Sequence, residues 1–273
     1  MALRVGVVLT LYLITGPVLG DWDSGGAHTI HFPQRPDPDG WGVQATTVML
    51  ADDWRCSQGG LVDDVHIWFS WQGDLEGTVD SVGLAIYADD ANGPHSKPGE
   101  ILWLHGGIDE ADYFAIREYG TGDQRWYGPD TGTVNQHDHQ TVWQLNITNI
   151  DEFCGTYGNP WGYDGAFRQE EGRVYWLSVG MLVMGMASYG WETADVGDYA
   201  APWTGTHFGG AAVYWGTDPN TGKSDWLELA DPLSGDLLDL AFVIAPEPTT
   251  LAIVAVGGLA LLHGRRIRFE RLP

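Results

Sequence analysis

Apolar residues recur at every second position in several short stretches of the chain. Val65, Ile67, Phe69 and Trp71 form the first such series, and a period of two is typical of a β-strand with one buried face. Other apolar or alternating runs lie at residues 82–86, 101–104, 142–147, 174–183, 211–215, 226–229 and 238–244. The pattern predicts strands at these positions.

Turn-forming residues separate the predicted strands. Gly, Pro, Asn and Asp gather at residues 91–94, 128–132, 157–160 and 218–222, where they supply the backbone angles of tight turns. No segment combines a sustained 3.6-residue period with helix caps. Many short strands with frequent turns predict an all-β domain over residues 21–245, a single large β-sandwich of the jelly-roll kind.

The first 20 residues depart from this pattern. The apolar run 5–18 follows Arg4, and Val18 and Gly20 are small enough for the positions that a signal peptidase reads. The run is too short to span a bilayer comfortably as a helix, which needs about 20 residues. We therefore expect residues 1–20 to be a cleaved signal peptide, with an uncleaved N-terminal anchor as the alternative.

The C-terminal residues form a second distinct segment. Pro246, Glu247 and Pro248 precede a short apolar stretch, residues 251–262, which has no polar face. An arginine cluster follows it, made of Arg265, Arg266, Arg268 and Arg271. Cations on one side of an apolar helix hold that side in the cytoplasm, so we expect a transmembrane helix here.

This order of features resembles the PEP-CTERM sorting signal of exported bacterial proteins. The resemblance covers residues 246–273, with the Pro-Glu-Pro motif at its start. It implies processing near the motif by a membrane-embedded exosortase, and an association with exopolysaccharide and the cell-surface matrix. The protein would be anchored in the membrane through its C-terminus, and would reach the cell surface or the extracellular space after processing.

The body of the chain is similar to an uncharacterised domain that is common in exported PEP-CTERM proteins. The similar segments are residues 50–54 with Cys56, 65–71, 126–127, 129–132, 138–139, 169–179 and 239–244. That family has no assigned activity, so the resemblance supports the architecture alone.

Residues 21–245 are strongly acidic, with 35 acidic and 8 basic residues and a net charge of −27. Such a body repels nucleic acid and anionic lipid headgroups, so no nucleic-acid partner is expected. The charge fits a solvated surface outside the cell, or a surface that binds cations.

Cys56 and Cys154 are the only cysteines. Export would place them in an oxidising compartment, where a disulfide persists, and two cysteines allow one intramolecular pairing. A Cys56–Cys154 disulfide, two separate buried thiols and an intermolecular bond are the three alternatives.

Tryptophan is the most distinctive candidate for ligand binding. All 14 tryptophans lie in the body; their rings can stack on sugars, but they also fill apolar cores. Trp68 and Trp71 stand on opposite faces of one predicted strand, so one of them faces away from the core. Trp126, Trp161 and Trp203 neighbour turn residues, and because binding residues favour loops, these three are the candidate ligand platforms.

Two groups of residues could bind a metal. Asp218, Asn220 and Asp225 surround a glycine turn that begins like a calcium loop but lacks the closing Glu, and an Asx turn would use the same residues. His137 and His139 could offer two imidazoles to zinc or copper, with a hydrogen-bonded turn as the alternative. His28 and His31 are further possible ligands for zinc or copper. The oxygen atoms of Asp52, Asp53, Asp63 and Asp64 are further possible ligands for calcium.

The sequence singles out no catalytic residue. It has no G-x-S-x-G, H-E-x-x-H or P-loop motif. A glycosidase needs two carboxylates, and Glu152, Glu192 and Glu228 are isolated acids near aromatic residues. We favour a non-enzymatic surface protein that binds polysaccharide or a surface partner, over a secreted glycan hydrolase and over a structural protein crosslinked by calcium.

Overall fold

The computed structural model describes residues 33–57, 59–93, 95–109, 113–195 and 210–245. The predicted signal peptide at residues 1–20 and sorting signal at residues 246–273 lie outside these ranges, as do Trp203, His28 and His31. Within the ranges described, no helix is both long enough and apolar enough to cross a membrane.

The first sheet closes on itself. Its strands run in the order β11 (Tyr189–Glu192), β1 (Trp41–Gln44), β7 (Phe114–Gly128), β8 (Thr133–Ile147), β4 (Asp64–Trp71) and β14 (Phe242–Ala245). Because β11 pairs with β4 as well as with β1, the strands β11, β1, β7, β8 and β4 form a closed ring, called the ring below. β14 pairs with residues 64–67 of β4, on the same edge of β4 where β11 pairs with residues 69–71.

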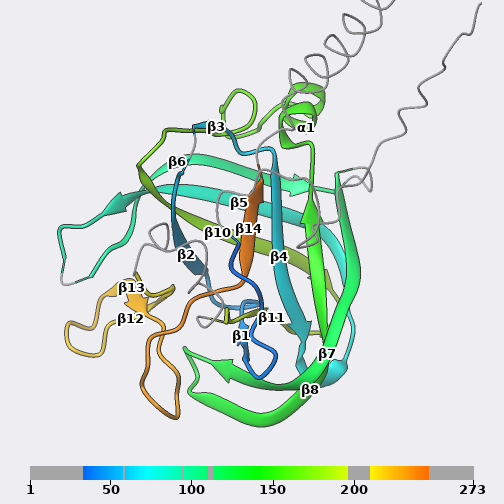
Figure 1. Ribbon diagram of the computed structural model, residues 1–273, viewed down its shortest axis with the longest axis vertical. Helices are drawn as coiled ribbons and strands as arrows, with labels where there is room; N and C mark the ends of the chain where they lie inside the picture. The colour runs from blue at the N-terminus through cyan, green and yellow to red at the C-terminus, as the bar shows by residue number, and fades with distance from the viewer. Residues whose placement is uncertain (1–32, 58, 94, 110–112, 196–209, 246–273) are drawn as a thin grey trace, which may run out of the picture.

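Two long, curved strands allow the ring to close. β7 and β8 pair antiparallel, and their register shifts at three places between Glu118 and Trp126. Such irregularities bend a strand pair, and Figure 1 shows both strands curling through the lower part of the molecule. The curl brings the end of β7 beside β1, with which it pairs in parallel.

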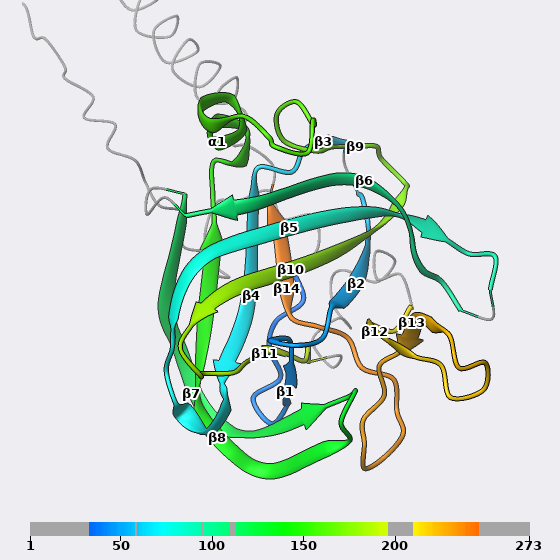
Figure 2. The same cartoon turned by 180° about the vertical axis from the view of Figure 1, so that it is seen from behind.

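The second sheet stays open. Its strands run in the order β13 (Ser224–Glu228), β12 (Val213–Thr217), β2 (Leu50–Arg55), β10 (Val174–Met184), β5 (Thr78–Asp90) and β6 (Lys97–Ile108). Figure 2 shows β10, β5 and β6 crossing the face of the molecule. A small additional sheet joins β3 (Gly60–Leu61) to β9 (Arg168–Gln169).

One apolar core lies between the two sheets. Phe69 and Trp71 of β4 pack in the same buried cluster as Leu84 of β5 and Leu177 of β10. Trp68, the residue before Phe69, lies in a separate buried cluster. The expectation that Trp68 and Trp71 occupy opposite faces of one strand is therefore confirmed.

A short helix closes one end of this core. α1 (Ile150–Tyr157) buries Ile150, Phe153 and Cys154, and a single 3-10 turn, η1 (Gln72–Asp74), follows β4. The sequence pattern does not predict α1, because eight residues make only two turns and cannot show a sustained helical period.

The all-β class and the main predicted strands are confirmed, with residues 65–71 in β4, 82–86 in β5 and 174–183 in β10. The finer prediction, a jelly-roll sandwich, is not confirmed, because the observed pairings give a closed ring beside an open sheet. The sequence pattern also misses β7, in which polar residues and glycines interrupt the alternation. It misses five shorter strands as well, namely β1, β2, β3, β9 and β11.

Candidate functional site

A depression of about 390 Å³ lies between the end of β6 and α1. It is called the α1 depression below. Figure 1 shows α1 standing above the end of β6. The loop after α1 forms the remaining wall, through Gly158, Asn159 and Pro160.

Aromatic rings line this depression in a connected series. The ring of Phe153 lies 5.0 Å from that of His105 and 4.9 Å from that of Tyr157, centroid to centroid. Tyr157 is 54% exposed, so its ring ends the series at the surface. The helix therefore holds one ring in the core and presents the next to solvent, one turn later.

Trp161 stands at the rim of the α1 depression with 62% of its surface exposed. Its Nε1 atom lies 3.8 Å from the position that a Cβ on Gly106 would occupy. Asn159 fixes this loop in place, because its side-chain Nδ2 donates to the Leu104 carbonyl at 2.9 Å and its Oδ1 accepts from the Trp161 backbone N–H at 2.9 Å.

The depression also offers polar groups. His105 is buried, and its Nε2 lies 3.2 Å from the Gly158 carbonyl. Because that carbonyl only accepts, Nε2 donates to it, whereas Nδ1 is a buried atom that has no partner in the part of the chain described. Asp109 adds an exposed carboxylate at the edge. The site thus combines exposed rings with a few hydrogen-bonding groups.

The expectation that Trp126 is a ligand platform is wrong. Trp126 is fully buried, and its ring lies edge-on to that of His139, 6.2 Å away. Trp126 sits opposite Gly42 in the β1–β7 pair. Its side chain therefore points into the closed ring of strands, although a turn follows two residues later. Of the three candidates, Trp161 is exposed as expected and Trp203 lies outside the described ranges.

The predicted calcium loop is an Asx turn. Asp218 accepts hydrogen bonds from the Asn220 backbone and from the Thr221 hydroxyl, both at 2.8 Å. Asp225 instead pairs with Lys97, at 2.8 and 2.9 Å. The carboxylates therefore do not converge, and the described residues contain no group of three or more His, Cys, Asp or Glu side chains that could hold a metal ion.

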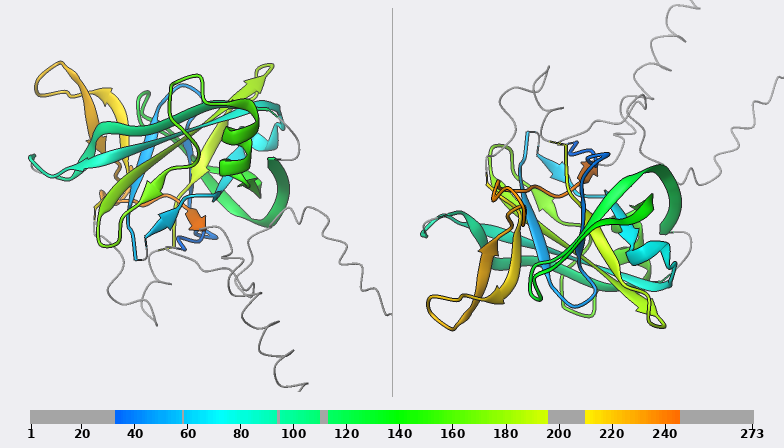
Figure 3. Two further views of the ribbon diagram at one scale, coloured as in Figure 1. Left: turned by 90° about the horizontal axis from the view of Figure 1, so that it is seen from above. Right: turned by 90° about the horizontal axis from the view of Figure 1, so that it is seen from below.

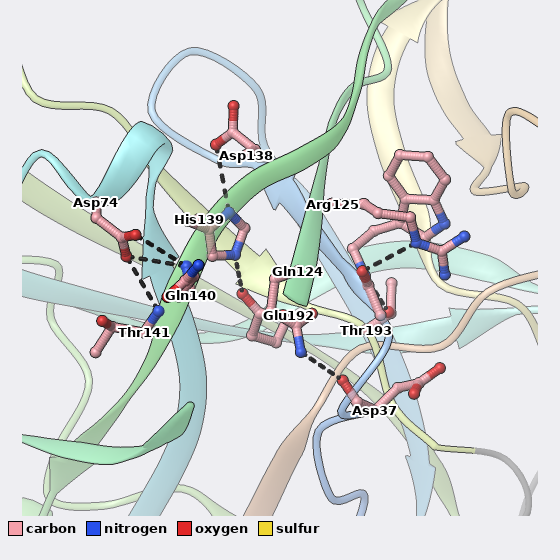
Figure 4. Close-up of polar contacts among 12 residues, drawn as sticks. Asp37, Asp74, Gln124, Arg125, Asp138, His139, Gln140, Thr141, Glu192 and Thr193 are labelled. Atoms are coloured by element: carbon pink, nitrogen blue, oxygen red, sulfur yellow. Dashed lines mark hydrogen bonds and ion pairs between the residues drawn. The ribbon is translucent and has the colours of Figure 1, made fainter. Parts of the chain in front are cut away.

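His137 and His139 do not share a site. His137 is exposed and lies 2.7 Å from Asp123, whereas His139 is fully buried against Glu192 and Asp138 (Figure 4). The prediction that their imidazoles lie together is wrong, because the strand turns one outward and the other into the ring.

The predicted disulfide is not formed. Cys56 and Cys154 are both buried thiols in the apolar core, where cysteine packs as a small apolar side chain. Burial, with the nearby Asp151 and Asp63 carboxylates, raises the pKa of Cys154 to about 11. The alternative of two separate buried thiols is the one observed.

The structure also buries a group of acidic side chains. Asp52, Asp53 and Asp239 are each less than a tenth exposed. Burial first, then repulsion from Asp239 and Asp89, raises the pKa of Asp53 to about 8, and burial raises that of Asp239 to about 7. The sequence did not predict the burial of these carboxyl groups, because adjacent aspartates are more often solvated.

No pair of carboxylates suited to glycoside hydrolysis is brought together in the α1 depression. Asp109 is the one acidic residue among its described lining residues. Glu192 is buried in the ring, Glu152 is exposed on α1, and Glu228 lies on β13 at 3.6 Å from His95.

Comparison with known sequences finds one family for the body of the chain. Residues 30–245 match a domain of unknown function, DUF7901, which agrees with the resemblance of the body to an uncharacterised domain. No curated protein and no solved structure matches the chain. Because the match spans well over half of the sequence, the chain belongs to the DUF7901 family.

Proposed function

We propose that this chain is an exported protein of the cell surface or extracellular matrix whose β-domain binds polysaccharide in the α1 depression. One observation carries the proposal, namely the two exposed rings of Trp161 and Tyr157, 62% and 54% exposed, beside a concave surface. Large aromatic side chains gain most of their stabilising energy by burial. Rings left exposed at the rim of a depression are therefore suited to stacking on a ligand.

The chemistry of the depression favours a sugar over a purely apolar ligand. Sugars present flat C–H faces that pack on rings, and hydroxyl groups that both donate and accept. Asp109, an exposed carboxylate at the edge of the depression, can accept from such a hydroxyl. An apolar ligand would leave this carboxylate without a partner.

The shape of the neighbouring surface favours an extended chain over a single sugar. A second depression of about 460 Å³ shares Gly107 with the α1 depression and continues past Gly83 and Gly180. A Cβ on Gly107 or Gly180 would meet nothing within 4 Å. The absence of side chains at these positions leaves room for further sugar units beyond Trp161 and Tyr157.

The binding proposal predicts a loss of polysaccharide affinity when one exposed aromatic side chain is removed. In the Trp161→Ala variant we expect the full-length chain to bind exopolysaccharide, isolated from the cells that produce the protein, at least about tenfold more weakly. Co-sedimentation at increasing polysaccharide concentration, in calcium and in EDTA, measures the affinity. Binding should be equal in both, because the oxygen-rich turns do not converge.

Trp215→Ala is the matched control. Trp215 is 41% exposed on β12, and Figure 3 shows the β12–β13 hairpin and α1 at opposite ends of the molecule. The control variant should bind like the unchanged chain. Equal losses in both variants, or no sedimentation of the unchanged chain, would contradict the proposal.

The sorting part of the proposal has a separate test. We propose that residues 246–273 direct processing by an exosortase-like enzyme, and we expect Glu247→Ala to accumulate a larger, membrane-bound form. Immunoblotting of membrane and released fractions measures size and location, with Glu270→Gln in the tail as the control. An unchanged size and location for Glu247→Ala would mean that the segment is a plain anchor.

A further inference from the structure

The interior of the ring is tightly filled and contains several polar side chains. A Cβ on Gly42 of β1 would lie 2.5 Å from Ser70 Oγ of β4, 3.0 Å from His139 Cε1 of β8 and 3.3 Å from Glu192 Oε1 of β11. β1 and β8 are not neighbours in the ring, so these side chains meet across its interior. The apolar core lies on the opposite face of the same strands.

Both nitrogens of His139 face carboxylate oxygens. Nε2 lies 3.3 Å from Glu192 Oε1, and Nδ1 lies 3.3 Å from Asp138 Oδ2 (Figure 4). A neutral imidazole can donate from one nitrogen only, whereas the imidazolium ion donates from both. The geometry is therefore that of a protonated histidine between two acceptors.

The burial of His139 and Glu192 makes their interaction important for the stability of the ring. The side chains of His139 and Glu192 are completely buried, and Glu192 Oε2 has no hydrogen-bond partner among the described residues. The groups that face His139 from the other ring strands, Gly42, Ser70 and Trp126, carry no charge. Without a protonated His139, the Glu192 carboxylate would be a buried charge without a counter-charge, which is strongly destabilising.

We propose that His139 and Glu192 form a pH-sensitive latch that links β8 to β11 across the ring and is closed while His139 is protonated. Opening of the latch would loosen β11, the short strand that completes the ring by pairing with both β1 and β4. The inference is independent of polysaccharide binding, because the ring interior and the α1 depression share no residue.

The pH direction follows from linkage. Burial alone would lower the pKa of His139, but the hydrogen bond and charge of Glu192, with a smaller contribution from Asp138, raise it above its ordinary value. A raised folded pKa means that the stabilisation is fully present below the unfolded value, about 6.5, and is lost as the pH rises through the folded pKa.

Histidine-selective NMR of the full-length chain tests the latch. We expect the His139 ring signal, assigned by its absence in His139→Gln, to titrate with a midpoint above about 6.5. Glu192→Gln should lower this midpoint by at least about 1 pH unit. A midpoint at or below about 6.5 in the unchanged chain overturns the proposal. A midpoint that Glu192→Gln leaves in place overturns it as well.

Thermal unfolding measures the consequence for stability. At pH 5.5 we expect His139→Gln to melt roughly 3–6 °C below the unchanged chain, and this difference should shrink by at least half at pH 8.5. His137→Gln, which alters an exposed histidine on the same strand, should melt with the unchanged chain at both pH values. A His139→Gln difference that is equal at both pH values would show a purely structural role and overturn the latch.

Discussion

Replacing Gly190 by alanine is expected to lower the free energy of unfolding by about 3 kcal/mol, near the upper end for an overpacked core. A Cβ at this position would lie 2.8 Å from the backbone carbonyl carbon of Gly42 and 2.8 Å from Cζ3 of Trp126. Backbone cannot rotate aside, and Trp126 is fully buried. The new methyl group must therefore push β11 away from β1 at the place where the ring closes.

Urea unfolding of the full-length variant, followed by circular dichroism, measures this loss. Gly180→Ala is the control, because Gly180 also lies within a strand but a Cβ there would meet nothing within 4 Å. We expect the control to be unchanged or slightly more stable, since alanine reduces the entropy of the unfolded chain. If both variants unfold at the same urea concentration as the unchanged chain, the tight packing of the ring interior is refuted.

Replacing Asp53 by asparagine is expected to stabilise the protein at alkaline pH. Asp53 is 1% exposed, and its Oδ2 has no partner among the described residues. Its folded pKa of about 8 lies far above the model-peptide value of 3.8. Between these values the folded state keeps a proton that the unfolded state has released, so stability falls as the pH rises.

The loss of folding stability caused by ionising this buried carboxyl group is on the order of several kcal/mol above pH 8. It is shared with Asp52 and Asp239, because the three carboxyl groups interact and titrate together. Asparagine keeps the shape of the side chain and never ionises, so it removes the cost of charging this site.

Thermal unfolding at pH 5 and pH 9 checks the prediction. We expect Asp53→Asn to raise the midpoint by about 5 °C or more at pH 9, and to change it little at pH 5, where Asp53 is already neutral. Asp218→Asn is the control; its carboxylate is exposed, and hydrogen bonds from Asn220 and Thr221 lower its pKa, so it should give no gain at pH 9. An Asp53→Asn gain of equal size at both pH values would contradict a charging cost.

Local sequence signals predicted the candidate site only in part. Trp161 and Trp126 both adjoin turn residues, yet one is exposed and the other fully buried. The difference arises because Trp126 faces Gly42 across the β1–β7 pair, a contact between residues far apart in sequence. His105 and Tyr157 could not be recognised as partners of Trp161, because only the packing of α1 on the end of β6 brings them together.

The same limit applies to the acidic and cysteine residues. Asp52 and Asp53 have the sequence of a solvated pair, but β2 lies inside the second sheet, between β12 and β10, so both are buried. Cys56 and Cys154 allowed a disulfide by count alone, whereas the core holds each as a thiol. Composition states which groups are present, but burial decides their charge and reactivity.

The sequence by itself determined the all-β class, most strand positions and the two faces of β4, because side-chain alternation is a property of each strand alone. It also determined the acidic charge of the body. Only the tertiary structure decided that β11 joins β1 to β4 and closes the ring, since strand pairing depends on contacts distant in sequence and on the irregularities that bend β7 and β8. The interior that holds His139 and Glu192 exists only once that ring is closed.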